Sequence, residues 1–216
     1  MIHLSLSEMQ SLSKQAIRGS GFSWGIAEEI AWQVCRLEHL RLPAFTELSK
    51  WLDWHLRNPN FDLKKHQNCP QRTKRVKMGM FFGICLLDEG FQKLKEEDLI
   101  LNGVLAPLFL IPALQYFAQV QVVKFLVHWQ DCDFEILSEH LYQSGNNISP
   151  KKPIKVVIKT VNDYHNQSNC CNFTHQNNLI ECGLPTAVSK KVHQRMCTLA
   201  SQICVPSDEY SENDAG

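Results

Sequence analysis

Hydrophobic residues in the first sixty positions recur every three or four residues, which is the spacing of amphipathic helices. The pattern predicts three helices, over about residues 5–18, 23–40 and 46–56. The first begins with a capping box, in which Ser5 and Glu8 each satisfy a free backbone amide. Ser23 is a suitable N-cap for the second helix, and Pro43 ends it.

The middle of the chain changes to the alternating pattern that is typical of strands. Apolar side chains at 123, 125, 127 and 129 alternate with Lys124, Leu126 and His128, and residues 134–137 form the expected hairpin partner. Residues 154–161, with the sequence IKVVIKTV, predict a further strand. Residues 80–87 are apolar enough to be buried, with Gly79 and Gly83 marking tight packing or turns.

Residues 99–123 carry no charged side chain, so a membrane helix has to be considered. Pro107 and Pro112 interrupt this run, and four amide side chains lie within it. We therefore expect a buried strand over residues 104–111 and no membrane span. A helix then begins with Pro112 at its first position, where a missing amide costs little.

The order of elements favours an α+β fold. N-terminal helices precede a mainly antiparallel sheet, and a C-terminal helix over about residues 187–204, capped by Thr186, follows it. The length of 216 residues suits a single domain, residues 1–216, whose residues 1–60 are helical. Residues 205–216 are expected to form an acidic, mobile tail.

The charge balance limits the classes of binding partner, and the cysteine content indicates the cellular compartment. The chain has 22 basic and 22 acidic residues, so no global field directs it to nucleic acid or to anionic membranes. Its basic stretch, residues 64–77, lacks interleaved aromatic residues and is expected to be a solvated loop. The chain begins without a signal-peptide pattern and has nine cysteines but no Cys-x-x-Cys pair, which predicts a soluble, cytoplasmic protein with reduced thiols.

The glycine-rich stretch at residues 18–29, RGSGFSWGIAEE, is the most specific motif in the chain. Its glycine spacing differs from that of a dinucleotide-binding loop, and it lacks the lysine of a Walker loop. The pattern instead predicts a corner between two helices, in which Gly19 ends the first helix with a positive φ. The N-terminus of the second helix, at Ser23, could hold a small anion.

Two groups of candidate site residues follow from this motif. The predicted ligand-binding residues are Arg18, Gly19, Gly21, Ser23, Trp24 and Gly25. The predicted catalytic candidates are Glu28, Glu29 and Asp88. Neighbouring residues on a helix point about 100° apart. We therefore expect only one of the two glutamates to face a given pocket, with both as first-turn acids of the helix.

No cofactor or metal site is predicted. Five potential zinc ligands lie in a polar region, but their spacing does not fit the short Cys-x-x-Cys or His-x-x-x-His units of structural zinc sites: His165, Cys170, Cys171, His175 and Cys182. Isolated histidines such as His39, His55 and His128 are expected to be surface or hydrogen-bonded residues.

Residues 18–29 resemble the N-terminal signature of a bacterial family, the domain of unknown function 3726, and residues 4–8 resemble the helix start that precedes it. Looser similarity to that family is found at residues 83–88, 107–112 and 204–211. Met78 and Gly79 stand where the family has a Cys-Pro step, so a role for that cysteine does not transfer. The resemblance implies a soluble bacterial cytoplasmic protein and no particular reaction.

Two functions are consistent with these observations. The first is binding or transformation of a small anionic metabolite at the N-terminus of the second helix. The second is a non-catalytic interaction or accessory role in a metabolic system, with the first three helices as a docking surface. Exposure of Trp51 and Trp54 would favour the second function, and their burial would remove its main support.

Overall fold

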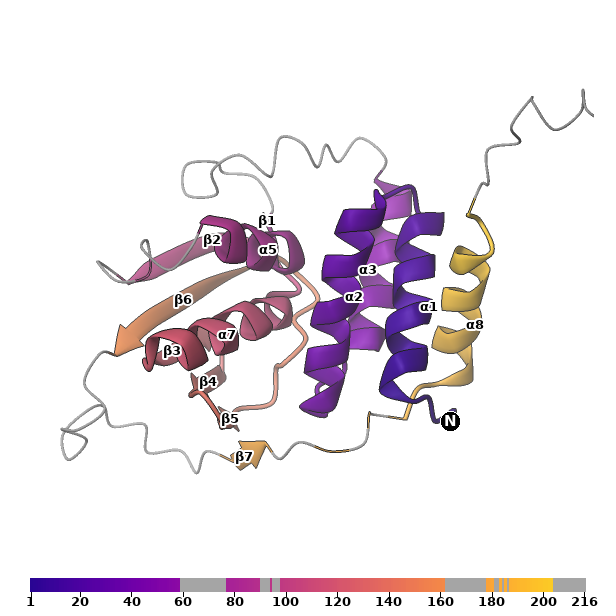
Figure 1. The fold of residues 1–216 in the computed structure, drawn as a ribbon. Coiled ribbons are helices and arrows are strands. Elements are labelled where there is room, and N and C mark those ends of the chain that lie inside the picture. The colour runs from indigo at the N-terminus through magenta and orange to yellow at the C-terminus, as the bar shows by residue number, and fades with distance from the viewer. Residues whose placement is uncertain are drawn as a thin grey trace, which may run out of the picture.

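The computed structural model describes residues 1–58, 77–89, 94, 98–161, 178–180, 183, 185 and 187–203. It has two parts: a bundle of helices, and a sheet with two further helices lying on it (Figure 1). The architecture is α+β, as the order of elements predicts. The first part of the basic stretch, residues 64–76, and the predicted acidic tail lie outside the described residues.

The bundle consists of α1 (Leu6–Gly19), α2 (Trp24–His39), α3 (Ala44–Arg57) and α8 (Lys190–Ala200). The three predicted N-terminal helices are confirmed to within two residues at each end. Helix α8 is shorter than predicted at both ends, because it begins after Ser189 and not after Thr186, and it ends at Ala200 and not at about residue 204. The Ser189 hydroxyl accepts a hydrogen bond from the backbone amide of Val192 at 3.2 Å.

The corner between α1 and α2 depends on two glycines in different ways. Gly21 follows the end of α1 and has a φ of +96°, a backbone conformation that L side chains rarely adopt. Gly19 is still helical, so the prediction that it takes a positive φ is wrong. It is needed for space, because a Cβ atom at Gly19 would lie 1.8 Å from the carbonyl oxygen of Leu199 on α8.

The corner between α2 and α3 is closed by a buried carboxylate. Pro43 precedes α3 and provides no side-chain cap. Glu38, only 1% exposed, instead accepts a hydrogen bond from the backbone amide of Phe45 at 2.8 Å. The carboxylate therefore satisfies one of the amides that the start of α3 leaves free.

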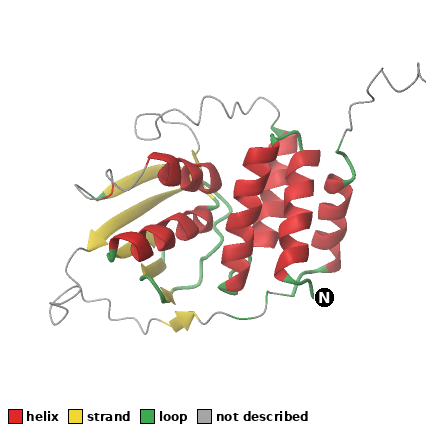
Figure 2. Ribbon diagram, viewed as in Figure 1, coloured by secondary structure: helices red, strands yellow, loops and turns green. Residues whose placement is uncertain are grey.

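The sheet has seven strands in the order β1-β2-β6-β3-β4-β5-β7. Their bounds are β1 (Lys77–Met78), β2 (Leu99–Leu105), β3 (Lys124–Trp129), β4 (Cys132–Ile136), β5 (Leu141–Ser144), β6 (Ile154–Val161) and β7 (Asn178–Ile180). All neighbouring strands are antiparallel except β1 and β2, which confirms the mainly antiparallel prediction. Helices α5 (Gly79–Glu89) and α7 (Ile111–Gln121) lie on one face of the sheet (Figure 2).

The predicted strand over residues 104–111 is wrong in position. Strand β2 ends at Leu105, Ala106 takes a left-handed conformation, and η1 (Pro107–Leu110) is a 3-10 helix that leads into α7. A short run of apolar residues has no period that separates a strand from a buried helical turn. Pro107 cannot donate a ladder hydrogen bond, which favours the end of the strand before it.

Residues 80–87 form most of α5, and the two glycines in this region mark tight packing, as predicted. A Cβ atom at Gly79 would lie 2.2 Å from the carbonyl oxygen of Ala106. One at Gly83 would lie 2.8 Å from the carbonyl oxygen of Phe109. The absence of side chains at these two positions therefore lets α5 lie directly against the chain that follows β2.

A single cluster of buried side chains runs from the bundle into the sheet. It includes Ile17 of α1, Phe45 of α3, Phe109 of η1 and Trp129 of β3, all of them 0% exposed. The bundle and the sheet thus share one hydrophobic core. Within the described residues, no helix is both long enough and apolar enough to span a membrane.

We predict that Gly19→Ala lowers the free energy of unfolding by about 2–3 kcal/mol, because the new methyl group forces α1 and α8 apart. Gly25→Ala is the matched control, because a Cβ atom at Gly25 in α2 meets no atom within 4 Å. This control should leave stability unchanged or raise it by up to about 1 kcal/mol. Urea unfolding followed by circular dichroism measures both variants, and equal effects would contradict the close contact with α8.

Candidate functional site

A cleft of about 840 Å³ lies where α1, α2 and α5 meet. Helix α1 contributes Lys14, helix α2 contributes Glu28 and Glu29, and helix α5 contributes Asp88. Trp32, Ile84, Leu87 and Tyr116 are among the apolar and aromatic residues that also line it. The three predicted catalytic candidates are therefore brought together in one cleft.

The charged residues of the cleft do not balance. The ammonium group of Lys14 lies 2.5 Å from a carboxylate oxygen of Glu28. Among the residues that the structure describes, neither Glu29 nor Asp88 forms an ion pair. Three carboxylates and one ammonium group leave the cleft with a formal charge of minus two (−3 + 1).

The expectation that only one of Glu28 and Glu29 faces a pocket is wrong, because both line the cleft. Adjacent side chains on a helix point about 100° apart, so the two glutamates cannot share a narrow pocket. Both can still lie on the wall of a wide cleft. Both glutamates also lie beyond the first turn of α2, which begins at Trp24. They are therefore not the first-turn acids that the sequence predicts.

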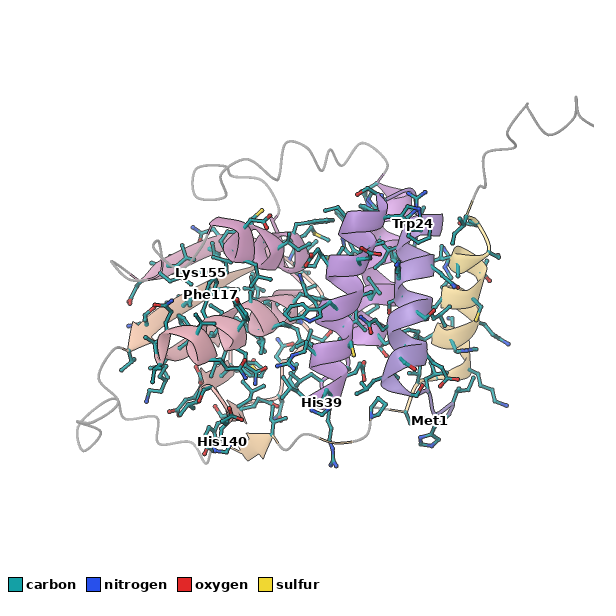
Figure 3. The ribbon with its side chains drawn as sticks, in the orientation of Figure 1. Met1, Trp24, His39, Phe117, His140 and Lys155 are labelled. Atoms are coloured by element: carbon teal, nitrogen blue, oxygen red, sulfur yellow. The ribbon has the colours of Figure 1, made fainter. Side chains whose placement is uncertain are left out.

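Trp24 connects the glycine-rich motif to this cleft. Its ring is 48% exposed at the start of α2 (Figure 3). The ammonium group of Lys14 lies 5.3 Å from the centre of one of its rings, and the guanidinium carbon of Arg18 lies 4.9 Å away. Both distances are in the range of cation–π interactions. Trp24 therefore helps to hold Lys14, which in turn pairs with Glu28.

None of the six predicted ligand-binding residues is among those that line the cleft. Arg18 donates a hydrogen bond to the carbonyl oxygen of Phe22, and the Ser23 hydroxyl accepts one from the backbone amide of Ile26 at 3.4 Å. Gly19 allows the close packing of α1 against α8, and Gly21 allows the turn of the corner. A role of these six residues in ligand binding stays a prediction.

The sheet brings together three polar residues whose proximity was not predicted. His128 Nδ1 lies 2.6 Å from an Asp133 carboxylate oxygen, and Asp133 is opposite Ser144 on the next strand. The strand of Asp133 therefore lies between those of the serine and the histidine, and the Ser144 hydroxyl has no hydrogen-bond partner among the described residues. A serine nucleophile requires the histidine next to its hydroxyl, so this order does not form a catalytic triad. Residues 130–131, Gln-Asp, are not a typical two-residue hairpin turn, so no strong signal in the sequence indicates the His128–Asp133 pair.

Two cysteines, Cys132 and Cys197, have surroundings that bear on the reactivity of their thiols, and neither lines the cleft. Cys132 is fully buried on β4, and burial raises the pKa of its thiol to about 12, which leaves it protonated at neutral pH. Cys197 is exposed on α8, with its sulfur 3.8 Å from Nε2 of His193.

The cysteines and histidines at positions 165–182 lie outside the described residues. Within the described residues, no cluster of three potential ligands could hold a metal ion.

The fold and the cleft define the protein as an α+β protein with an acidic cleft between its helical bundle and the helices of its sheet. A model of the family described as Protein of unknown function (DUF3726) matches residues 4–80. This match confirms the resemblance seen in residues 18–29, and the looser segments after residue 80 lie beyond it. The comparisons with curated proteins and with solved structures gave no match.

We predict that Trp24→Leu lowers the free energy of unfolding by about 1 kcal/mol, because it removes cation–π contacts worth about 0.5–1 kcal/mol each. Trp24→Phe keeps an aromatic face and should lose about half as much. Urea unfolding measures both variants. If the leucine and phenylalanine variants are equally stable, the ring does not hold Lys14 and Arg18 in the way that the distances indicate.

Proposed function

We propose that the protein binds a small molecule with a positively charged amine in the cleft between α1, α2 and α5. The observation that carries this proposal is that Glu28, Glu29 and Asp88, from two helices, line one cleft in which Lys14 is the only basic residue among the described lining residues. An ammonium group placed near Glu29 and Asp88 gains two charge-assisted hydrogen-bond acceptors. The same position is unfavourable for an anion.

The remaining lining residues indicate what else the ligand carries. The cleft, at about 840 Å³, is within the usual range of small-molecule sites, which is roughly 300–1,000 Å³. Ile84 and Leu87 of α5 provide an apolar wall, and Trp32 and Tyr116 provide aromatic rings. Aromatic faces attract organic cations. The composition therefore suits an amine attached to an aliphatic or aromatic group.

An anionic metabolite at the N-terminus of α2 is a second candidate, as the sequence suggests. It is favoured by Lys14 and Arg18, whose cationic groups flank Trp24, and by the open space above Gly25. In this reading Lys14 would bind the ligand instead of balancing Glu28. The two candidates therefore predict opposite effects of removing the Lys14 charge.

The interaction or accessory role has lost part of its support. Trp51 is only 4% exposed and Trp54 is partly buried, so they do not form an exposed aromatic surface on α3. The aromatic residue that is exposed on the first three helices is Trp24, and its ring already contacts the cationic groups of Lys14 and Arg18. We therefore place the small-molecule function first, and leave open whether the ligand is also transformed.

Isothermal titration of the full chain with spermidine, with 1,4-butanediol and with succinate tests the charge of the ligand. We predict saturable binding of spermidine and none of the other two. Glu29→Gln and Asp88→Asn should each weaken spermidine binding about fivefold or more, because each removes one charge-assisted acceptor. Lys14→Gln should tighten it by about two- to fivefold, because the cleft becomes more negative.

Glu139→Gln is the matched control, because Glu139 is an exposed acid between β4 and β5 and does not line the cleft. It should leave spermidine affinity unchanged. Equal losses for Glu139→Gln and Glu29→Gln would show that the cleft is not the binding site. Binding of succinate that disappears in Lys14→Gln would replace this proposal with the anionic one.

A further inference from the structure

A second cleft, of about 320 Å³, lies between α3 of the bundle and the end of β2. Trp51 and Trp54 of α3 form one side of it, and Leu105 and Ala106 form another. Residues 149–151, which precede β6, complete the lining. The cleft shares no lining residue with the acidic cleft, so the two are separate spaces.

The aromatic wall of this cleft is held rigidly. Trp51 is only 4% exposed, and its ring centre lies 5.2 Å from that of Phe22 and 5.6 Å from that of Phe81. His55, one turn further along α3, stacks on the same indole at 5.7 Å. Contacts from α3, α5 and the α1–α2 corner thus fix Trp51. A wall fixed in advance lowers the entropy that a ligand loses on binding.

On the opposite side of this cleft, at the end of β2, the backbone has an unusual conformation. The pairing of β2 with β6 shifts register between Leu101 and Val104, and Ala106 then has a φ of 50°. A left-handed alanine is strained, and such strain persists only where surrounding contacts impose it. Gly79 supplies the contact here, because its backbone lies directly against the carbonyl oxygen of Ala106. The position of Ala106 at the cleft is therefore fixed by its packing.

The described lining residues give this cleft a net positive charge, whereas those of the acidic cleft give it a net negative charge. Lys50 pairs with Glu47 at 2.5 Å, which leaves Lys151 as the unbalanced charge among the lining residues. The indole N–H of Trp51 is buried and has no acceptor among the described residues. The cleft thus combines apolar and aromatic walls with one excess cation.

We propose that this second cleft binds a small aromatic carboxylate. A planar ring fits between indole and aliphatic walls, where offset or edge-to-face packing is favourable. A single carboxylate matches the single excess charge of Lys151. The volume is at the lower end of the range for ligand sites, which suits one ring with one polar group and not a peptide.

Titration of the full chain with sodium benzoate, benzamide and benzylamine tests this proposal, with isothermal calorimetry for affinity and tryptophan fluorescence as a second signal. We expect saturable benzoate binding, benzamide binding at least about threefold weaker, and no benzylamine binding. Lys151→Gln should weaken benzoate about two- to fivefold and leave benzamide unchanged. Trp54→Ala should weaken both about tenfold or more, whereas Trp54→Phe should retain most of the affinity.

Lys155→Gln is the matched control, because Lys155 of β6, labelled in Figure 3, is also exposed and is not among the residues that line the cleft. It should leave benzoate affinity unchanged. The proposal is overturned if benzoate does not saturate by about 20 mM, if benzylamine binds more tightly than benzoate, or if Lys155→Gln acts like Lys151→Gln. Glu29→Gln should leave benzoate affinity unchanged, so failure of the benzoate proposal can be distinguished from failure of the amine proposal.

Discussion

The contact between the backbones of Gly19 and Leu199 joins the two ends of the chain, and the site depends on it. No side chain fits at Gly19, so α8 can lie directly against the end of α1. An ion pair between Asp53 of α3 and Arg195 of α8, at 2.6 Å, fastens the same helix to the opposite side of the bundle. The α1–α2 corner is thereby held at the point where Trp24 begins α2, and the position of α1 relative to α2 sets the distance between Lys14 and Glu28.

This arrangement explains why the most specific stretch of the sequence is not itself the cleft. Gly19, Gly21 and Ser23 build the corner, and their backbone and hydroxyl groups are used for packing, for a turn and for a cap. The acidic residues that α2 contributes to the cleft, Glu28 and Glu29, lie one turn further along the helix. The motif therefore acts on the cleft indirectly, through the ring of Trp24 and the ammonium group of Lys14.

Local signals in the sequence were sufficient for the first three helices, because a 3.6-residue period marks them directly and the first two have the caps Ser5 and Ser23. They were insufficient at residues 104–111, where an apolar run without a period concealed the end of β2 and a 3-10 turn. Asp88 was named from the sequence, but its place in the same cleft as Glu29 results from the packing of α5 against α2, which no local pattern encodes. The role of Lys14 was missed for the same reason, because its partners Trp24 and Glu28 lie across the corner.

The family match ends near the start of α5, and this boundary divides both clefts. Lys14, Glu28 and Glu29 lie within the matched segment, whereas Asp88 and Tyr116 lie beyond it. In the second cleft, Trp51 and Trp54 lie within the segment, whereas Ala106 and Lys151 do not. The bundle helices thus provide one wall of each cleft, and the sheet with its two helices provides the other. Under both proposals a ligand would contact both walls, so changes in the part beyond residue 80 would alter what each cleft accepts without disturbing the corner between α1 and α2.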